Sequence, residues 1–174
     1  EPFMKVLVTG ASGWTAAAIL DALRRHNHTV VAFDLAGSDK PDGTEFVAGD
    51  VSDYQAIERA IHNADAVVHL AVTNIYDTPD LPFAVNVKGT NNVFAAARKH
   101  NIERIVLMSS ACVHLQGTDL IDAELDWHSS PDEHHLYDLT KRLQEEIARD
   151  YCQTFAMNCV TLRAGHIVDG RHNV

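Results

Sequence analysis

The sequence predicts an α/β domain in which a parallel sheet carries helices on both faces. Short apolar runs alternate with helix-forming segments from end to end, and this alternation is typical of strand–helix–strand units. The length of 174 residues suits one domain with a core of its own. The first such unit, a strand, a turn, a helix and a second strand, is complete by Asp34.

The turn of this first unit is suited to a phosphate group. An apolar run leads into Gly10, Ser12 and Gly13, and a helix-forming run follows. Gly10 can take a tight turn, Gly13 lets backbone approach a diphosphate, and the helix N-terminus offers N–H groups to the anion. Asp34 ends the second strand roughly 20 residues later, where an acid can bind the ribose hydroxyls of an adenosine. The sequence therefore predicts a doubly wound, Rossmann-like dinucleotide-binding domain over residues 1–174.

The remaining elements follow from the apolar pattern and the turn residues. Ser52 and Gln55 form a capping box, which predicts the start of a helix. A long loop at 117–133 is of the kind that usually serves a site. The strands are expected at 6–8, 30–33, 45–48, 66–70, 104–109 and 158–163, and the helices around 16–20, from the capping box to about 62, at 83–100 and at 135–155.

Composition and charge exclude several classes of function. The formal net charge is -10 and no cluster of Lys or Arg stands out, so nucleic acid and anionic membranes are poor partners. No apolar run approaches the roughly 20 residues that cross a bilayer, and the start lacks the pattern of a signal peptide. Cys112, Cys152 and Cys159 are odd in number and lack close metal-type spacing. We therefore expect a cytoplasmic protein that binds neither nucleic acid nor membrane.

A second group of residues has the chemistry of an acid–base site. Tyr137 and Lys141 lie four positions apart on an expected helix, so both project from one face. A lysine ammonium beside a phenol favours the phenolate, which lowers the tyrosine pKa and suits it to proton transfer. Ser110 ends a strand at the carboxyl edge of the sheet, where ligands of such folds bind. The same spacing also occurs in plain surface pairs, but the dinucleotide turn and the strand-end serine favour a catalytic role.

With these motifs in order, the chain resembles the extended short-chain dehydrogenase/reductase family, in its epimerase/dehydratase-like branch. The resemblance runs from Met4 to about Arg163. The residues that it assigns to the cofactor are Gly10, Ser12, Gly13, Trp14, Asp34, Asp50, Val51, Leu70, Ala71, Val72, Asn86, Tyr137 and Lys141.

The resemblance also implies a mechanism and a cofactor. A bound nicotinamide would exchange hydride with a substrate carbon while Tyr137 moves the proton of the attached oxygen. Lys141 would hold the nicotinamide ribose, and Ser110 would orient the substrate oxygen. No arginine follows Asp34 to meet a 2′-phosphate, so NAD is favoured over NADP. Lys40 is a nearby cation that could meet a 2′-phosphate, so NADP is retained as the less favoured cofactor.

Departures from the family pattern bear on the substrate. Ala111 and Cys112 stand where sugar-nucleotide dehydratases have an acid pair, which argues against dehydration, and Gly165 is closer to the uronate or aldose dehydrogenases. Family members continue well beyond Val174, so we expect the C-terminal substrate region to be absent from the 174 residues. The leading hypothesis is an NAD-dependent oxidoreductase or epimerase acting on a nucleotide sugar, uronate or aldose. The alternative is a truncated or non-catalytic NAD-binding sensor or scaffold.

Three further features receive a non-catalytic interpretation. The acids and histidines at 132–135 suit a helix start better than a metal site, and we expect no metal. His69 is interpreted as a core or cofactor-lining residue, and Cys112 as a small buried residue. An apolar stripe at helical spacing is expected in the core or at a subunit interface, and the family's paired long helices imply a homodimer. The stripe consists of Leu139, Leu143, Ile147 and Tyr151.

Overall fold

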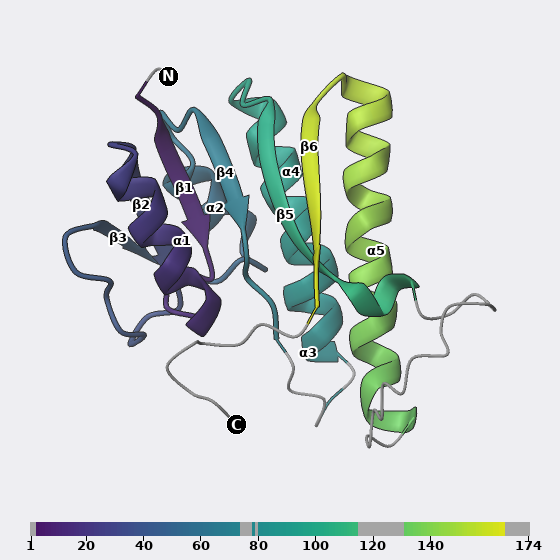
Figure 1. Ribbon diagram of the computed structural model, residues 1–174. Helices are drawn as coiled ribbons and strands as arrows, with labels where there is room; N and C mark the ends of the chain where they lie inside the picture. The colour runs from purple at the N-terminus through teal and green to yellow at the C-terminus, as the bar shows by residue number, and fades with distance from the viewer. Residues whose placement is uncertain (1–2, 74–77, 79, 115–130, 166–174) are drawn as a thin grey trace.

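The computed structural model describes residues 3–73, 78, 80–114 and 131–165. One six-stranded parallel sheet has the order β3-β2-β1-β4-β5-β6 (Figure 1). This is the order of a doubly wound sheet, so the predicted fold class is confirmed. The strands are β1 (Lys5–Thr9), β2 (Thr29–Asp34), β3 (Glu45–Ala48), β4 (Ala66–His69), β5 (Arg104–Ser110) and β6 (Asn158–Ala164).

Helices lie on both faces of the sheet (Figure 1). On one face, α1 buries Ala16 and Leu20 against apolar side chains of β1 and β2. On the other, α2, α4 and α5 pack on a larger core that includes Phe33 and Phe94. The helical elements are α1 (Trp14–Arg25), α2 (Tyr54–Ala60), α3 (Asp80–Pro82), the π-helical η1 (Phe83–Lys88), α4 (Gly89–Lys99), the 3-10 turn η2 (Ala111–His114) and α5 (Pro131–Phe155).

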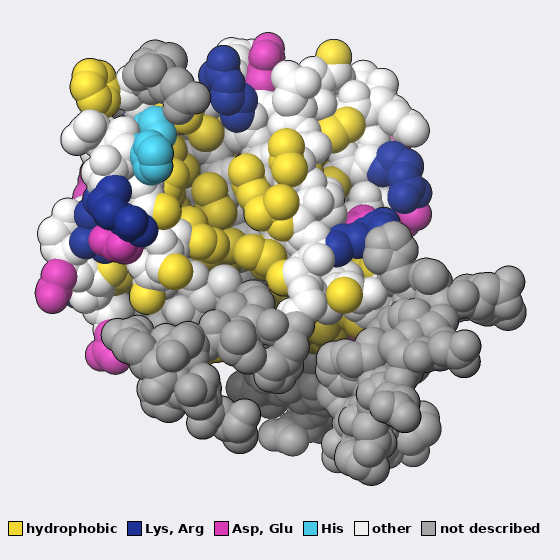
Figure 2. Space-filling view, viewed as in Figure 1, with side chains coloured by type: hydrophobic (Ala, Val, Ile, Leu, Met, Phe, Trp, Pro, Cys, Tyr) yellow, Lys and Arg dark blue, Asp and Glu magenta, His cyan; other side chains and the backbone are white. Residues whose placement is uncertain are grey.

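The face that carries α1 is less completely covered. Hydrophobic side chains gather over its middle (Figure 2), and Val160 and Leu162 of β6 are 58% and 45% exposed. Among the described residues, α1 is the helix that covers this face, and it packs beside β1 and β2 rather than β6.

Three expected boundaries differ from the structure. The helix expected at 83–100 is preceded by α3 and opens with a wide π-helical turn before α4 begins. The cap of α2 is Asp53 rather than Ser52, because the Ser52 N–H donates to Asp50 Oδ1 at 2.8 Å and stays outside the helix. α5 begins at Pro131, a residue that suits a first helical position, so the last three positions of the expected loop are helical. The rest of that loop lies outside the described residues.

The buried face of α5 is polar, which the apolar stripe did not predict. All four residues of the stripe are half-buried, although Ile147 and Tyr151 do pack against the core. The most buried side chains of α5 belong to a neighbouring face, where hydrogen bonds to the sheet and to α4 replace apolar contact. They are Thr140, Lys141, Gln144, Glu145 and Ala148.

Candidate functional site

The candidate site lies at the carboxyl edge of the sheet, where β1 and β4 are neighbours. Thr9, the last residue of β1, pairs with His69, the last residue of β4. From there one connection leads through α1 to β2 and the other through α4 to β5, so the two leave toward opposite halves of the sheet. Ligands of doubly wound sheets bind at this reversal of strand order. The predicted glycine turn and the predicted segment 70–72 both begin here.

The glycine turn is fixed by close backbone packing. Gly10 has a φ of 69°, and a Cβ at this position would lie 2.7 Å from both the Cα and the N of Ala71. Gly13 caps α1 without a side-chain hydrogen bond, and the first turn of that helix, all of it described, has no acid. The helix N-terminus therefore offers its N–H groups and the positive end of its dipole to an anion. This geometry fits the diphosphate of a dinucleotide.

Asp34 ends β2, as expected, and lies against the glycine turn. Its Oδ2 accepts the Ser12 N–H at 2.8 Å, and its Oδ1 accepts the Leu35 N–H at 2.7 Å. The carboxylate is thus held at the tip of β2 beside the start of α1. Lys40, the cation considered for NADP, has its Nζ 5.7 Å from the centre of the Phe46 ring.

The other predicted cofactor residues frame the same edge, and their contact with a cofactor stays a prediction. Trp14 and Val72 are 60% and 41% exposed. Val51 is buried against Gly89, where a Cβ would lie 2.7 Å from Val51 Cγ2. Leu70 and Ala71 are half-buried, as is Asp50, which turns the chain before α2.

Asn86 uses both ends of its amide within the protein. Its Oδ1 accepts the Thr73 N–H at 2.8 Å, and its Nδ2 donates to the Thr73 carbonyl at 3.1 Å and to Thr140 Oγ1 at 3.0 Å. The side chain is fully buried in the π-helical turn. Asn86 therefore holds the exit of β4 and the start of the polar face of α5 together.

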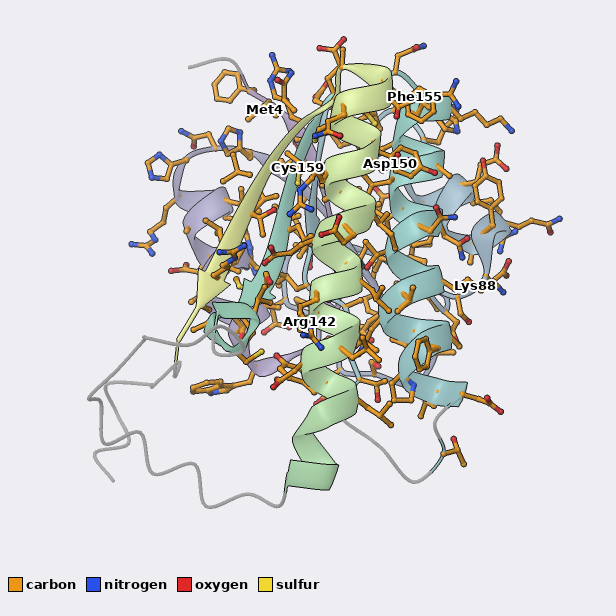
Figure 3. The ribbon with its side chains drawn as sticks, turned by 90° about the vertical axis from the view of Figure 1, so that its right-hand side faces the viewer. Met4, Lys88, Arg142, Asp150, Phe155 and Cys159 are labelled. Atoms are coloured by element: carbon orange, nitrogen blue, oxygen red, sulfur yellow. The ribbon has the colours of Figure 1, made fainter. Side chains whose placement is uncertain are left out.

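The structure brings Ser110, Tyr137 and Lys141 together at the end of β5. Lys141 Nζ lies 5.7 Å from the centre of the Tyr137 ring and donates to the Met108 carbonyl at 2.9 Å. Burial lowers the pKa of Lys141 to about 8. α5 places both residues, since it runs beside β5 and β6 (Figure 3).

The expected lowering of the Tyr137 pKa is wrong for this structure. Burial raises the pKa, and the hydrogen bond from the Ser110 hydroxyl opposes that effect only in part. Desolvation disfavours the phenolate, and the Lys141 ammonium donates to a backbone carbonyl instead of the phenol. Tyr137 is therefore a protonated phenol at neutral pH.

A buried network that the sequence did not reveal lies behind the site. The Thr9 hydroxyl is 2.6 Å from His69 Nδ1, and His69 Nε2 is 2.9 Å from Thr90 Oγ1. Thr90 Oγ1 donates to the Asn86 carbonyl at 2.6 Å and accepts Gln144 Nε2 at 2.7 Å. Because the Thr90 proton is already committed, His69 donates from Nε2 and accepts at Nδ1.

His69 is consequently a neutral core residue, which agrees with the favoured interpretation. Burial is the main cause that lowers its pKa to about 3, and the charge of Lys141 adds to the effect. Cys112 is also uncharged at neutral pH, because burial raises its pKa to about 11. Neither group is poised as a base or nucleophile.

Among the described residues, neither a metal site nor a membrane span is present. The side chains described, at 3–73, 78, 80–114 and 136–165, contain no group of three or more His, Cys, Asp or Glu arranged to bind a metal ion, and the acids and histidines at 132–135 lie outside them. No helix in the described part of the chain has the length and apolarity to cross a membrane.

A doubly wound sheet with a glycine turn at its carboxyl edge is the fold of dinucleotide-binding proteins. The family model described as the NAD dependent epimerase/dehydratase family matches residues 6–172. The chain belongs to this family.

Known relatives support the assignment and are longer than this chain. Uronate dehydrogenase of Pseudomonas syringae pv. tomato is 26% identical over 166 residues, which cover 94% of this chain and 60% of that protein. An undecaprenol-linked N-acetylglucosaminyl 4-epimerase of Escherichia coli O157:H7 is 32% identical over 160 residues, covering 84% of this chain and 43% of that one. The chain thus spans about half the length of such relatives.

Two solved structures have the same fold. A short-chain dehydrogenase/reductase superfamily protein of Agrobacterium tumefaciens with bound NAD is 35% identical, with a TM-score of 0.77, over 91% of this chain and 48% of that one. The UDP-glucose 4-epimerase of Thermus thermophilus in complex with NAD is 28% identical, with a TM-score of 0.77, over 92% and 54%.

Proposed function

We propose that the chain binds NAD at the carboxyl edge of the sheet and supplies the proton-transfer group for oxidation or epimerisation of a sugar-like substrate. The observation that carries the proposal is that edge itself: the glycine turn with Asp34 lies at one end, and Ser110 with Tyr137 and Lys141 at the other. A dinucleotide is long enough to connect such a phosphate site to a reaction site.

The turn and Asp34 support the choice of nucleotide. The diphosphate would lie over residues 10–13 at the N-terminus of α1, and the adenosine ribose would bind the Asp34 carboxylate. A negative charge at Asp34 repels the 2′-phosphate of NADP, and Lys40 is drawn toward the Phe46 ring. Both solved relatives described above contain NAD.

The side chains around Tyr137 support its role in proton transfer. NAD would supply the hydride acceptor for a substrate carbon, or the donor in its reduced form. When reduced NAD gives hydride to a carbonyl carbon, the protonated Tyr137 phenol can give its proton to the carbonyl oxygen. In the oxidative direction the phenolate would take the proton of the substrate hydroxyl while hydride passes to NAD, and in both directions the Ser110 hydroxyl can hold that oxygen in line. A protonated Lys141 nearby would stabilise the phenolate that remains.

A sugar-like substrate is the class shared by the two relatives described above, whereas other relatives are by name a 2-alkyl-3-oxoalkanoate reductase and a 3-beta-hydroxysteroid dehydrogenase. The uronate dehydrogenase and the 4-epimerase both act on sugar derivatives by name. Ala111 and Cys112 follow Ser110 in place of an acid pair, and this favours dehydrogenation or epimerisation over dehydration.

Binding and turnover should be measured separately. Calorimetric titration with NAD and NADP tests the cofactor, and the absorbance of reduced cofactor follows turnover by the complete protein, substrate region included, on nucleotide sugars, uronates and aldoses. Tyr137→Phe should abolish turnover and leave NAD affinity nearly intact. Tyr151→Phe is the matched control, because it also removes a tyrosine hydroxyl from α5. That hydroxyl donates to Asn91 Oδ1 at 3.2 Å on the surface.

Each outcome decides part of the proposal. Failure to bind NAD would overturn all of it, and parental turnover in Tyr137→Phe would overturn the role of Tyr137. Tight NAD binding without turnover on any sugar would favour the alternative, a dinucleotide-binding sensor or scaffold.

A further inference from the structure

A buried carboxylate joins α5 to the ends of two strands, one helical turn after Lys141. Glu145 is 8% exposed, and its Oε1 accepts the Ser109 hydroxyl at 2.6 Å. Arg163 donates to both oxygens of the same carboxylate, from Nε at 2.9 Å and from Nη2 at 2.7 Å. Ser109 and Arg163 are direct neighbours in the pairing of β5 with β6.

We propose that Glu145 is a positioning residue for Lys141: its hydrogen bonds fix the rotation of α5 against β5 and β6, and its carboxylate lies on the same helix face as the Lys141 ammonium. This inference deepens the proposed function, because it matters for catalysis only where Lys141 serves the nicotinamide ribose and the phenol.

The geometry gives Glu145 control over the direction of the Lys141 side chain. The two residues are four apart on one helix and therefore lie on the same face. Three hydrogen bonds to two adjacent strands leave α5 little freedom to rotate or slide. At this rotation the Lys141 ammonium donates to the Met108 carbonyl at 2.9 Å. Phe155 and Cys159 mark the turn that returns the chain from α5 to β6 (Figure 3).

The electrostatic part depends on which neighbours of Lys141 carry charge. Both Cys112 and Glu145 raise the pKa of Lys141 against the effect of burial. The Cys112 thiol, with a pKa of about 11, is uncharged in the range where Lys141 titrates, and His69 is neutral there too. Of the two groups that raise the pKa of Lys141, Glu145 is thus the one that acts at pH 7–8. The titratable and charged groups around Lys141 and its partners are His69 on β4, Cys112 on η2, Tyr137, Asp138 and Glu145 on α5, and Arg163 on β6.

Two substitutions that break the same ion pair separate this role from a merely structural one. Glu145→Gln keeps an oxygen for Ser109 but removes the negative charge, so the pKa of Lys141 should fall by about one unit. Arg163→Gln removes the cation that compensates Glu145, so the pKa of Lys141 should stay the same or rise. If the ion pair only stabilised the fold, the pKa of Lys141 should change in the same direction in both variants, since both lose the pair.

The measurement is a pH titration of ¹³Cε-labelled lysine by NMR, with the Lys141 signal assigned by its loss in Lys141→Met. Glu146→Gln is the matched control, because Glu146 is exposed on the same helix and pairs with Arg149; it should leave the midpoint unchanged. An unshifted Lys141 midpoint in Glu145→Gln would overturn the proposal.

Circular dichroism melting checks that each variant folds. If Glu145→Gln does not fold, Arg163→Gln decides alone, and a fall of the Lys141 midpoint there contradicts the proposal. The titration needs neither NAD nor substrate. A shifted Lys141 in a chain that fails to bind NAD would therefore refute the proposed function and leave the electrostatic role of Glu145 standing.

Discussion

The two ends of the candidate site differ in whether backbone or side chains form them. At the β1–α1–β2 end, backbone makes the site: Gly10 packs on the backbone of Ala71, and the Ser12 N–H holds Asp34. At the β5–α5–β6 end, buried polar side chains make it, and α5 presents Lys141 and Glu145 to the sheet. The first end should therefore be sensitive to added volume, and the second to lost hydrogen bonds and charges.

The largest expected effect is on NAD affinity at the backbone end. Gly10→Ala places a methyl group 2.7 Å from Ala71 backbone atoms, and we expect affinity to fall by at least about 100-fold by calorimetry. Gly43→Ala is the matched control, since Gly43 has the same φ of 69° and nothing within 4 Å of an added Cβ. It should cost about 1 kcal/mol of stability from backbone strain and no NAD affinity. An equal loss of NAD affinity in the two variants would show that backbone strain, and not the contact with Ala71, weakens NAD binding.

The next effect, on stability, tests the side-chain end. Thr90→Val removes the oxygen that accepts from His69 and Gln144 inside the core. We expect the free energy of unfolding to fall by about 2 to 3 kcal/mol in urea denaturation, because buried donors are left without acceptors. Thr44→Val is the control, since that hydroxyl donates to the Pro41 carbonyl in a surface loop. A loss in Thr90→Val no larger than in Thr44→Val would contradict the idea that the buried network, which joins β1, β4 and α4 to α5, stabilises the fold.

A smaller effect is the pH dependence of stability from His69. Its pKa is about 3 in the folded chain, against 6.5 for an unperturbed histidine. Between these values the unfolded chain binds a proton that the folded chain does not, so stability falls as pH falls through this window. The slope is at most about 1.4 kcal/mol per pH unit. Denaturation at pH 7, 6 and 5 should show a shallower slope in His69→Asn than in the parent. An equal slope in both would mean that His69 accepts a proton when folded. His26→Asn, at the exposed end of α1, controls for the loss of a histidine.

This contrast also explains what the sequence could predict. The strands, the glycine turn and the position of Asp34 at a strand end follow from short local patterns, and the structure bears out the predicted fold class. The network of Thr9, His69 and Thr90 joins positions 60 and 21 residues apart, and no local pattern marks such pairs. For α5, apolar spacing predicted part of the packing, since Ile147 and Tyr151 contact the core, but it did not reveal the more buried polar face beside them, where hydrogen bonds replace apolar contact. One local pattern does point to the polar face of α5: Glu145 is an acid four residues after Lys141, so the two lie on the same helix face.

The smallest expected effect concerns Asp34, whose side chain lies at the backbone end of the site. Asp34→Ala should weaken NAD binding by about tenfold and change NADP binding less, because the ribose contact is lost while repulsion of the 2′-phosphate is relieved. The carboxylate also accepts the Ser12 N–H, so the ratio of the two affinities, measured by calorimetry, is the informative quantity. Asp53→Ala is the control: it removes the cap of α2 and should cost about 1 kcal/mol of stability without changing either affinity. Equal weakening of NAD and NADP in Asp34→Ala would mean that the acid only supports the turn. The backbone end would then contain no side chain that selects the nucleotide.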